Sequence, residues 1–293
     1  MSAYKLNNVD LETYGILPGM ADGSIAVSGC FDLPARTGET YHEWDDEDGI
    51  EPYVDADEIF FAGRDLVFRG LIREGRDEVY YQLKQLYDAI AAFTAPVAFE
   101  TPYGTFDVLV SSISPTHYNG LTEIEVKFRE PVVDLTGGVL PATGSGQYTI
   151  DDIPFESFGL VVGAQKDRTA LPDSKTQYYT KHGSEGYQIT KRKAKKLTLT
   201  GFVRGNNLVD FISKVKALYL LFSSSGLRTL NLNNEIEIEC FATNGFKVTN
   251  VYLSGSVLAS FSIELLISTD AFYMLLTYAG DEILTFDENN III

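Results

Sequence analysis

The chain has 293 residues, of which 45% are hydrophobic and 22% charged, so it is long enough for two domains with cores of ordinary size. Its formal net charge of −18 disfavours tight binding to nucleic acid, because phosphate contacts require basic side chains. It has no basic and then apolar leader, and no apolar run approaches the roughly 20 residues of a membrane span. We therefore expect a soluble protein made in a reducing cytoplasm.

The sequence contains an internal repeat. Residues 4–16 read YKLNNVDLETYGI, and residues 148–160 read YTIDDIPFESFGL. A repeat separated by about half the chain indicates a duplicated domain. We predict a first copy over residues 1–135, a Gly/Ser/Pro linker over 136–147 and a second copy over 148–269.

In both copies the repeated opening leads into a long arm with a strong charge bias. The first arm is acidic over residues 43–58, and the second is basic over residues 181–196. The two arms are either solvated loops or opposed patches that meet between domains or between neighbouring copies. The candidate contact residues are Glu43, Asp45, Asp46, Asp48, Lys191, Arg192, Lys193 and Lys195.

After each arm, an alternating strand precedes one helix. The strands are residues 66–73, LVFRGLIR, and residues 197–204, LTLTGFVR. Apolar residues then recur at helical spacing over 79–93 and 208–222, which predicts one amphipathic helix per copy. Asp77 and Asn207 are the expected N-caps, because their short side chains can accept free backbone N–H bonds.

The rest of each copy has the period of two that is typical of half-buried strands. Asn119-Gly120 and Asn244-Gly245 are predicted hairpin turns. The predicted fold is mainly β in the α+β class: two tandem β-sandwiches or small barrels, each with one packed helix. Residues 270–293 fall outside the repeat and are expected to form a short C-terminal β extension.

No motif indicates an enzyme, a cofactor or a metal site. Asp46, Asp48 and Gly49 resemble part of a calcium loop, but Trp44 stands where its first ligand should be. The three histidines lie in loop-like sequence without catalytic spacing. The two cysteines, Cys30 and Cys240, are expected to be reduced and buried, without a disulfide.

The order of these motifs resembles the tail-tube-like domain of phage distal tail proteins. The resemblance rests on the opening at residues 4–16, the long arm, the strand that ends in Gly70-Leu71-Ile72, the single helix and the strands after it. It covers residues 4–134 and again 148–268. The second half departs from the family, because many members carry a lectin-like β-sandwich there.

The resemblance implies a structural protein of a phage or prophage tail. It implies a ring-forming distal tail or baseplate adaptor, hexameric or trimeric with pseudo-sixfold symmetry, located in the virion tail after synthesis in the host bacterium. DNA would pass through its lumen during genome ejection without specific binding, and no membrane contact is expected. Its implied partners are itself, the tail tube protein and the tail tip or hub proteins. The alternatives are the tail tube protein itself and a carbohydrate- or receptor-binding β-module.

Overall fold

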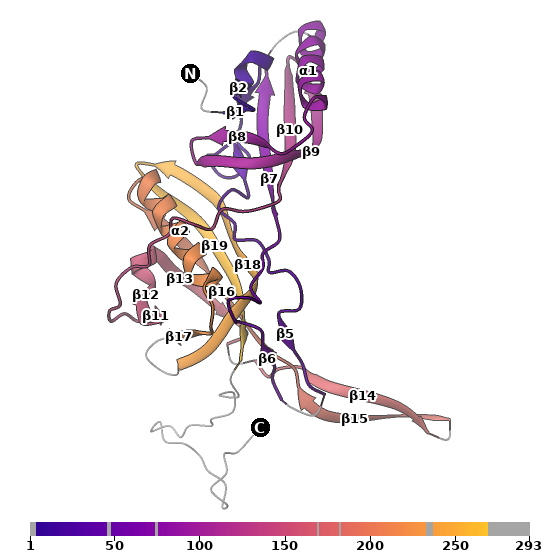
Figure 1. Ribbon diagram of the computed structural model, residues 1–293, viewed down its shortest axis with the longest axis vertical. Helices are drawn as coiled ribbons and strands as arrows, with labels where there is room; N and C mark the ends of the chain where they lie inside the picture. Colours follow the sequence, from indigo (N-terminus) through magenta and orange to yellow (C-terminus); the bar gives the residue numbers. More distant parts are fainter. Residues whose placement is uncertain are drawn as a thin grey trace, which may run out of the picture.

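The computed structural model describes residues 4–45, 48–73, 76–168, 170–181, 183–232 and 237–268, with only the backbone of residues 76–77, 176–181 and 184–190. Antiparallel strands form about half of this part of the chain, and two helices accompany them (Figure 1). The predicted mainly β fold of the α+β class is confirmed. The described strands form open sheets and no closed barrel. The C-terminal extension predicted over 270–293 lies outside the described residues.

The first large sheet lies at the top of Figure 1 and comes from the first half of the chain. Its strand order is β2-β1-β8-β9-β10-β7-β3, and β4 also pairs with β7. Helix α1, Arg76–Ala91, follows β7. The strands are β1 Lys5–Leu6, β2 Val9–Asp10, β3 Leu17–Pro18, β4 Val27–Ser28, β7 Arg64–Ile72, β8 Val97–Thr101, β9 Gly104–Tyr118 and β10 Leu121–Glu130.

The second large sheet has the order β12-β11-β17-β18-β19-β16-β13, which corresponds to the first sheet strand by strand. Helix α2, Leu208–Ser223, follows β16 as α1 follows β7. The strands are β11 Tyr148–Ile150, β12 Ile153–Pro154, β13 Leu160–Lys166, β16 Lys195–Gly205, β17 Arg228–Leu232, β18 Glu237–Ser254 and β19 Ser256–Ile267.

The arms of the two halves form two separate hairpins. Strands β5, Tyr41–His42, and β6, Glu51–Pro52, pair in the first arm. Strands β14, Ser174–Lys181, and β15, Ser184–Arg192, pair in the second arm and project away from the body at the lower end of the molecule (Figure 1). Both hairpins therefore lie at the same end, although they come from different halves of the chain.

The backbone angles of the repeated sequence motif explain why it contains Asn and Asp. Asn7 and Asn8 have φ of 50° and 65°, and Asp151 and Asp152 have φ of 50° and 61°. Two consecutive positive φ values make the tight turn that joins β1 to β2 and β11 to β12, and Asn and Asp tolerate it better than most residues. The short 3-10 helix that follows ends in both copies at a left-handed glycine, Gly15 or Gly159.

One predicted helix cap is confirmed and one is wrong. The Asn207 side chain accepts a hydrogen bond from the Asp210 N–H at 2.9 Å, at the start of α2. Asp77 is not a cap, because α1 begins one residue earlier, at Arg76, which places Asp77 inside the first helical turn. Asp is common both at a cap and in the first turn, so the sequence alone did not distinguish the two positions.

One predicted hairpin turn is also wrong. Asn119-Gly120 joins β9 to β10 as expected, and Gly120 has φ of 78°. Asn244-Gly245 instead lies inside β18, where the pairing with β19 shifts between Ala242 and Phe246. A Cβ atom on Gly245 would lie 2.0 Å from the Leu33 carbonyl oxygen. The glycine is therefore required by a close approach of the first half of the chain.

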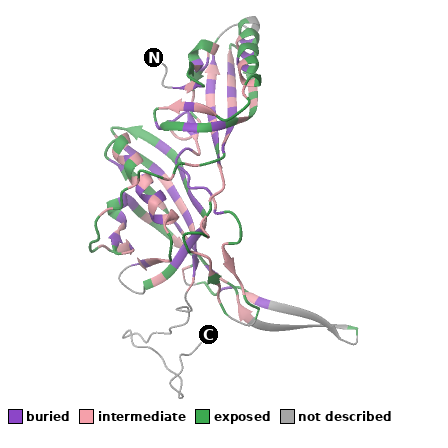
Figure 2. Cartoon of the chain, viewed as in Figure 1, coloured by how far each residue is buried: buried purple, intermediate pink, exposed green. Residues whose placement is uncertain are grey.

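Residues 22–36, here called the strap, make that approach along β18. Strand β17 pairs with β18 only over Glu237–Cys240, which leaves the rest of that edge for another segment. Leu33 N–H donates to the Phe246 carbonyl at 3.0 Å, and Ser24 N–H donates to the Val251 carbonyl at 2.8 Å. Within the strap, β4 pairs with β7 of the first sheet. The strap thus joins the two sheets, and buried residues of both halves form one hydrophobic core, drawn in purple in Figure 2.

The linker predicted over residues 136–147 also lies against the second half. A Cβ atom on Gly138 would be 2.2 Å from the carbonyl oxygen of Lys216 in α2. Gly144 N–H donates to the Asp152 carbonyl at 2.8 Å. The small residues of this stretch therefore allow the chain to pass close to α2.

We predict that replacing Leu33 by Ala costs about 2–5 kcal/mol of unfolding free energy, because Leu33 is fully buried between the halves. The matched control is Leu171→Ala, in the Leu-Pro sequence before the hairpin of the second arm, where the side chain is 52% exposed; it should change stability by less than about 0.5 kcal/mol. Urea unfolding of dilute, monomeric protein measures both. Equal effects would show that the strap does not hold the halves together.

Candidate functional site

A buried charged network lies where the two halves meet. Arg64, at the start of β7, places its Nε atom 2.5 Å from an oxygen of Glu130. Its Nη1 atom donates to the Tyr219 hydroxyl in α2 at 2.9 Å and to the Asp32 carbonyl at 3.0 Å. The side chains of Arg64 and Glu130 are 7% and 4% exposed. One guanidinium thus links the first sheet, the strap and the helix of the second half.

Asp32 fixes the strap to β18 from the other side. Its two carboxylate oxygens accept from the Val248 N–H at 2.8 Å and from the Lys247 ammonium at 2.9 Å. Loss of water raises the pKa of Asp32 above its ordinary value, although these two donors act in the opposite direction. The Asp32 carboxylate has thus exchanged its contact with water for two hydrogen bonds to β18 of the other half.

Aromatic rings complete this contact. The ring of Phe31 in the strap meets that of Phe211 in α2 edge to face, with centroids 5.1 Å apart. Tyr219 stacks on Phe246 of β18 at 5.6 Å. Such ring pairs stabilise a contact by more than the burial of their apolar area alone. Because this surface is continuous with both cores, the two halves act as a single packed body.

The two charged arms meet within one chain. Asp48 accepts a hydrogen bond from the Arg192 N–H at 2.6 Å and lies 3.8 Å from the Lys191 ammonium. Glu43 accepts from the Ala194 N–H at 3.1 Å. The first hairpin therefore lies on the base of the second. Both of these hydrogen bonds use backbone N–H groups, so net charge alone does not define the contact.

The other candidate contact residues have different positions. Asp45 is exposed, and Asp46 lies outside the described residues. Lys193 has an exposed side chain, and its N–H donates to the Asp173 carbonyl at 2.8 Å. Lys195 is buried.

A further contact between the arms comes from Lys175, which sequence reasoning missed. Its ammonium donates to the Trp44 carbonyl at 2.5 Å. Lys175 is one of several lysines in the second half, and no local pattern distinguishes it from the others.

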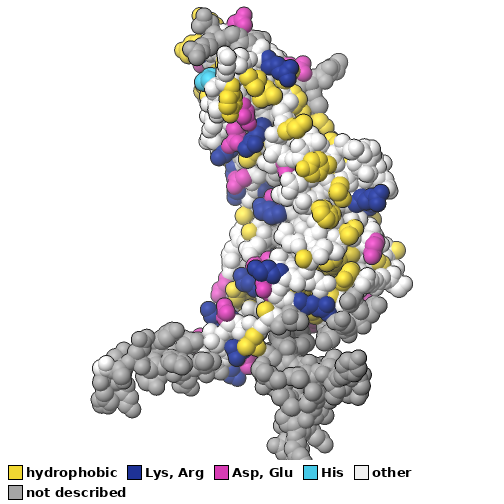
Figure 3. Space-filling model, turned by 180° about the vertical axis from the view of Figure 1, so that it is seen from behind, with side chains coloured by type: hydrophobic (Ala, Val, Ile, Leu, Met, Phe, Trp, Pro, Cys, Tyr) yellow, Lys and Arg dark blue, Asp and Glu magenta, His cyan; other side chains and the backbone are white. Residues whose placement is uncertain are grey.

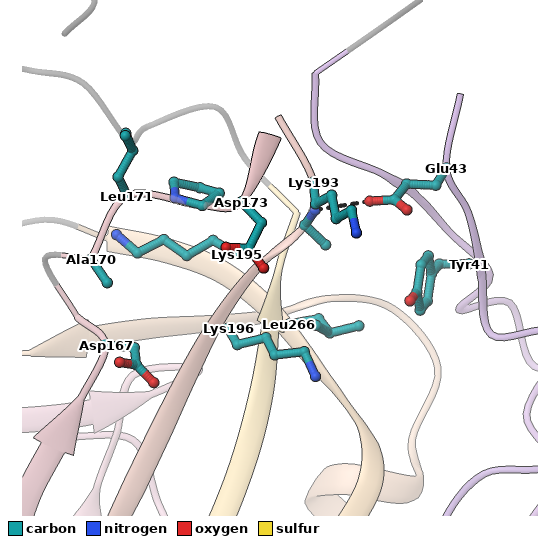
Figure 4. A pocket seen from close by; sticks show the side chains of 12 residues that line it. Tyr41, Glu43, Asp167, Ala170, Leu171, Asp173, Lys193, Lys195, Lys196 and Leu266 are labelled. Atoms are coloured by element: carbon teal, nitrogen blue, oxygen red, sulfur yellow. Dashed lines mark hydrogen bonds between the residues drawn. The ribbon is translucent and has the colours of Figure 1, made fainter. Parts of the chain in front are cut away.

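A cavity of about 520 Å³ lies at the junction of the arms, beside the hydrogen bond between Glu43 and Ala194 (Figure 4). Tyr41 and Glu43 line one side, and Lys193, Lys195 and Lys196 line the other. Burial lowers the pKa of Lys195, and the nearby positive charge of Arg168 lowers it further. The cavity lining thus carries both acidic and basic groups, which suits contacts between protein segments better than the capture of one small ion.

Three further features of the described residues concern metal ligands, membrane-spanning helices and the two cysteines. Within these ranges no three His, Cys, Asp or Glu side chains lie together as a metal site would require. No described helix is long and apolar enough to span a membrane. Cys30 and Cys240 are free thiols and buried, as predicted, and burial raises the pKa of both, that of Cys240 to about 12.

Comparisons with known proteins gave matches among solved structures. No family model and no curated protein matches the sequence. Among solved structures, the SPP1 Dit (gp 19.1) protein, described as a paradigm of the hub adsorption apparatus in phages infecting Gram-positive bacteria, matches with 12% identity and a TM-score of 0.34. The match covers 90% of this chain and 97% of that one. A TM-score of this size does not establish a shared fold.

We predict that Glu130→Gln costs about 3–5 kcal/mol, because it leaves the Arg64 charge buried without its carboxylate partner. The matched control is Asp65→Asn, which breaks the exposed pair between Asp65 and Arg129 and should cost at most about 1 kcal/mol. Chemical denaturation measures both. Similar small losses in the two variants would contradict a role for the buried network.

We also predict that Glu43→Gln combined with Asp48→Asn speeds hydrogen exchange at the Arg192 and Ala194 amides by about tenfold. Each amide then loses a charged acceptor and keeps a weaker neutral one. Asp45→Asn, at an exposed carboxylate of the same arm, is the control and should leave both rates unchanged. Unaltered exchange in the double variant would mean that backbone contacts alone, such as Gly49 N–H to the Arg192 carbonyl, hold the arms together.

Proposed function

We propose that this chain is a structural component of a phage or prophage tail, a ring-forming distal tail or baseplate adaptor around the DNA channel. The observation that supports this most is the fusion of two units with the same strand order through a strap on a sheet edge. Sheet edges that accept segments from outside their own unit are suited to assembly. A trimer of such chains would present six similar units and a hexamer twelve, each in a closed ring.

The charge distribution is compatible with a channel through which DNA moves. The net charge of −18 repels phosphates, so DNA could slide without sticking. Figure 3 shows that Lys, Arg, Asp and Glu are interspersed with hydrophobic side chains on the back of the molecule, without a broad basic field. The protein would therefore surround DNA without specific binding.

The projecting hairpin β14–β15 suits a role in contacts with other tail proteins. It extends well beyond the body of the molecule in Figure 1. In the proposed adaptor it would reach a neighbouring copy, the tail tube protein or the tip and hub proteins. The proposed function is structural, and the arms and the open sheet edges would form its contacts with other proteins.

Negative-stain imaging together with mass photometry at micromolar concentration tests this function. We expect discrete closed rings of three or six chains. Open-ended stacks would favour the tail tube protein, and specific glycan binding by a non-ring species would favour a receptor-binding module. A strict monomer at every salt concentration would contradict the proposal.

A further inference from the structure

The two helices correspond residue by residue, and this correspondence locates a second contact surface. Gln82 of α1 lies against Gly15, and Lys214 of α2 lies against the matching Gly159. In this register Tyr87 of α1 corresponds to Tyr219 of α2. The buried positions of the two helices then also coincide, as Val79 with Phe211, Leu83 with Val215 and Leu86 with Leu218.

The two tyrosines have very different surroundings. Tyr219 is 4% exposed, because the strap and Arg64 cover it. Tyr87, at the same place in the first half, is 40% exposed. The outer side of α1 is largely green in Figure 2. The tyrosine at this helix position is thus covered in the second half and uncovered in the first.

The sheet edges show the same contrast. Phe246 of β18 pairs with Ile263, and Ile113 of β9 pairs with the corresponding Val126. Beside Phe246 the strap covers the edge of β18. In the described part of the chain, β8 pairs with β9 only as far as Val108. Residues 109–118 therefore pair with β10 on one side and with no strand on the other. A long open edge of this kind readily accepts another segment.

The second half also contains a segment that matches the strap. Leu33-Pro34 precedes the hairpin of the first arm, and Leu171-Pro172 precedes the hairpin of the second. Leu33 is fully buried against Phe246, whereas Leu171 is 52% exposed. Lys195 precedes Leu197 by two residues, as Arg64 precedes Leu66, so a cation stands at the start of both strands.

We propose that the α1–β9 face, formed by Tyr87 and the β9 edge around Ile113, binds the Leu171-Pro172 segment of a second copy of this chain. The contact would repeat between chains the contact that the strap makes within one chain. It joins two different surfaces, so it either closes into a ring or grows as an open chain. The proposal rests on the self-assembly proposed above, and it names the surfaces that assemble.

Disulfide trapping tests this contact directly. Leu33 and Phe246 are bridge partners across an antiparallel pair, a separation at which cysteines can be joined. We therefore expect the double variant Ile113→Cys, Leu171→Cys to form covalent dimers and higher multimers under mild oxidation, seen on non-reducing gels. Each single variant is a control and should remain monomeric on the gel. The native thiols are buried and have raised pKa values, so they give little background.

A second test compares two substitutions at exposed tyrosines of α1, which do not disturb the core. Tyr87→Arg should weaken self-association by at least tenfold in sedimentation velocity, because it places a charge in the contact. Tyr80→Arg, on the same helix at a side chain that is 67% exposed, should leave association unchanged. Equal effects of the two substitutions would contradict the assigned face.

The combined outcomes separate this inference from the proposed function. Rings that form normally with Tyr87→Arg, together with no crosslink in the Ile113→Cys, Leu171→Cys variant, would overturn the inference and leave the ring function standing. Crosslinked multimers that never close into rings would support the inference and count against the adaptor ring. A crosslink that closes within one chain, or a tail tube or hub protein on the α1–β9 face in place of a second copy, would overturn the inference.

Discussion

The strap on the free edge of β18 is the interaction on which the rest of the structure depends. β17 covers only the first part of that edge, and the strap completes it with backbone bonds from Ser24 and Leu33. Arg64 then connects the strap to α2 and to the first sheet through one buried guanidinium. Without this segment, β18 would keep an open edge and the Arg64 guanidinium would lose its hydrogen bond to the Asp32 carbonyl. The fixed relation between the two halves, and the position of both arms at one end, follow from this contact.

The duplicated sequence made much of the fold predictable. Local chemistry specifies the two-residue turns at Asn7-Asn8 and Asp151-Asp152, the cap at Asn207 and the apolar stripes of both helices. These features depend on neighbours within a few residues, so a single sequence is enough to find them. The mainly β class followed from the same patterns.

The contact between the halves could not be predicted in the same way. Asp32 and Lys247 are 215 residues apart, and no periodicity relates them. Asn244-Gly245 has the composition of a turn, but the close approach of the Leu33 backbone places it in a strand. The opposite charges of the arms were visible in sequence, yet the bonds from Arg192 and Ala194 use backbone N–H groups that any residue except proline would supply. Long-range packing selected among locally acceptable conformations in each case.

We propose that one contact is used twice, once within the chain and once between chains. Cryo-electron microscopy of the purified assembly tests it most directly. The account predicts that, at the junction between two copies, Leu171 lies beside Ile113 in the arrangement that Leu33 and Phe246 have within each chain. A map in which the α1–β9 face points to solvent, or in which another surface forms the junction, would contradict the account.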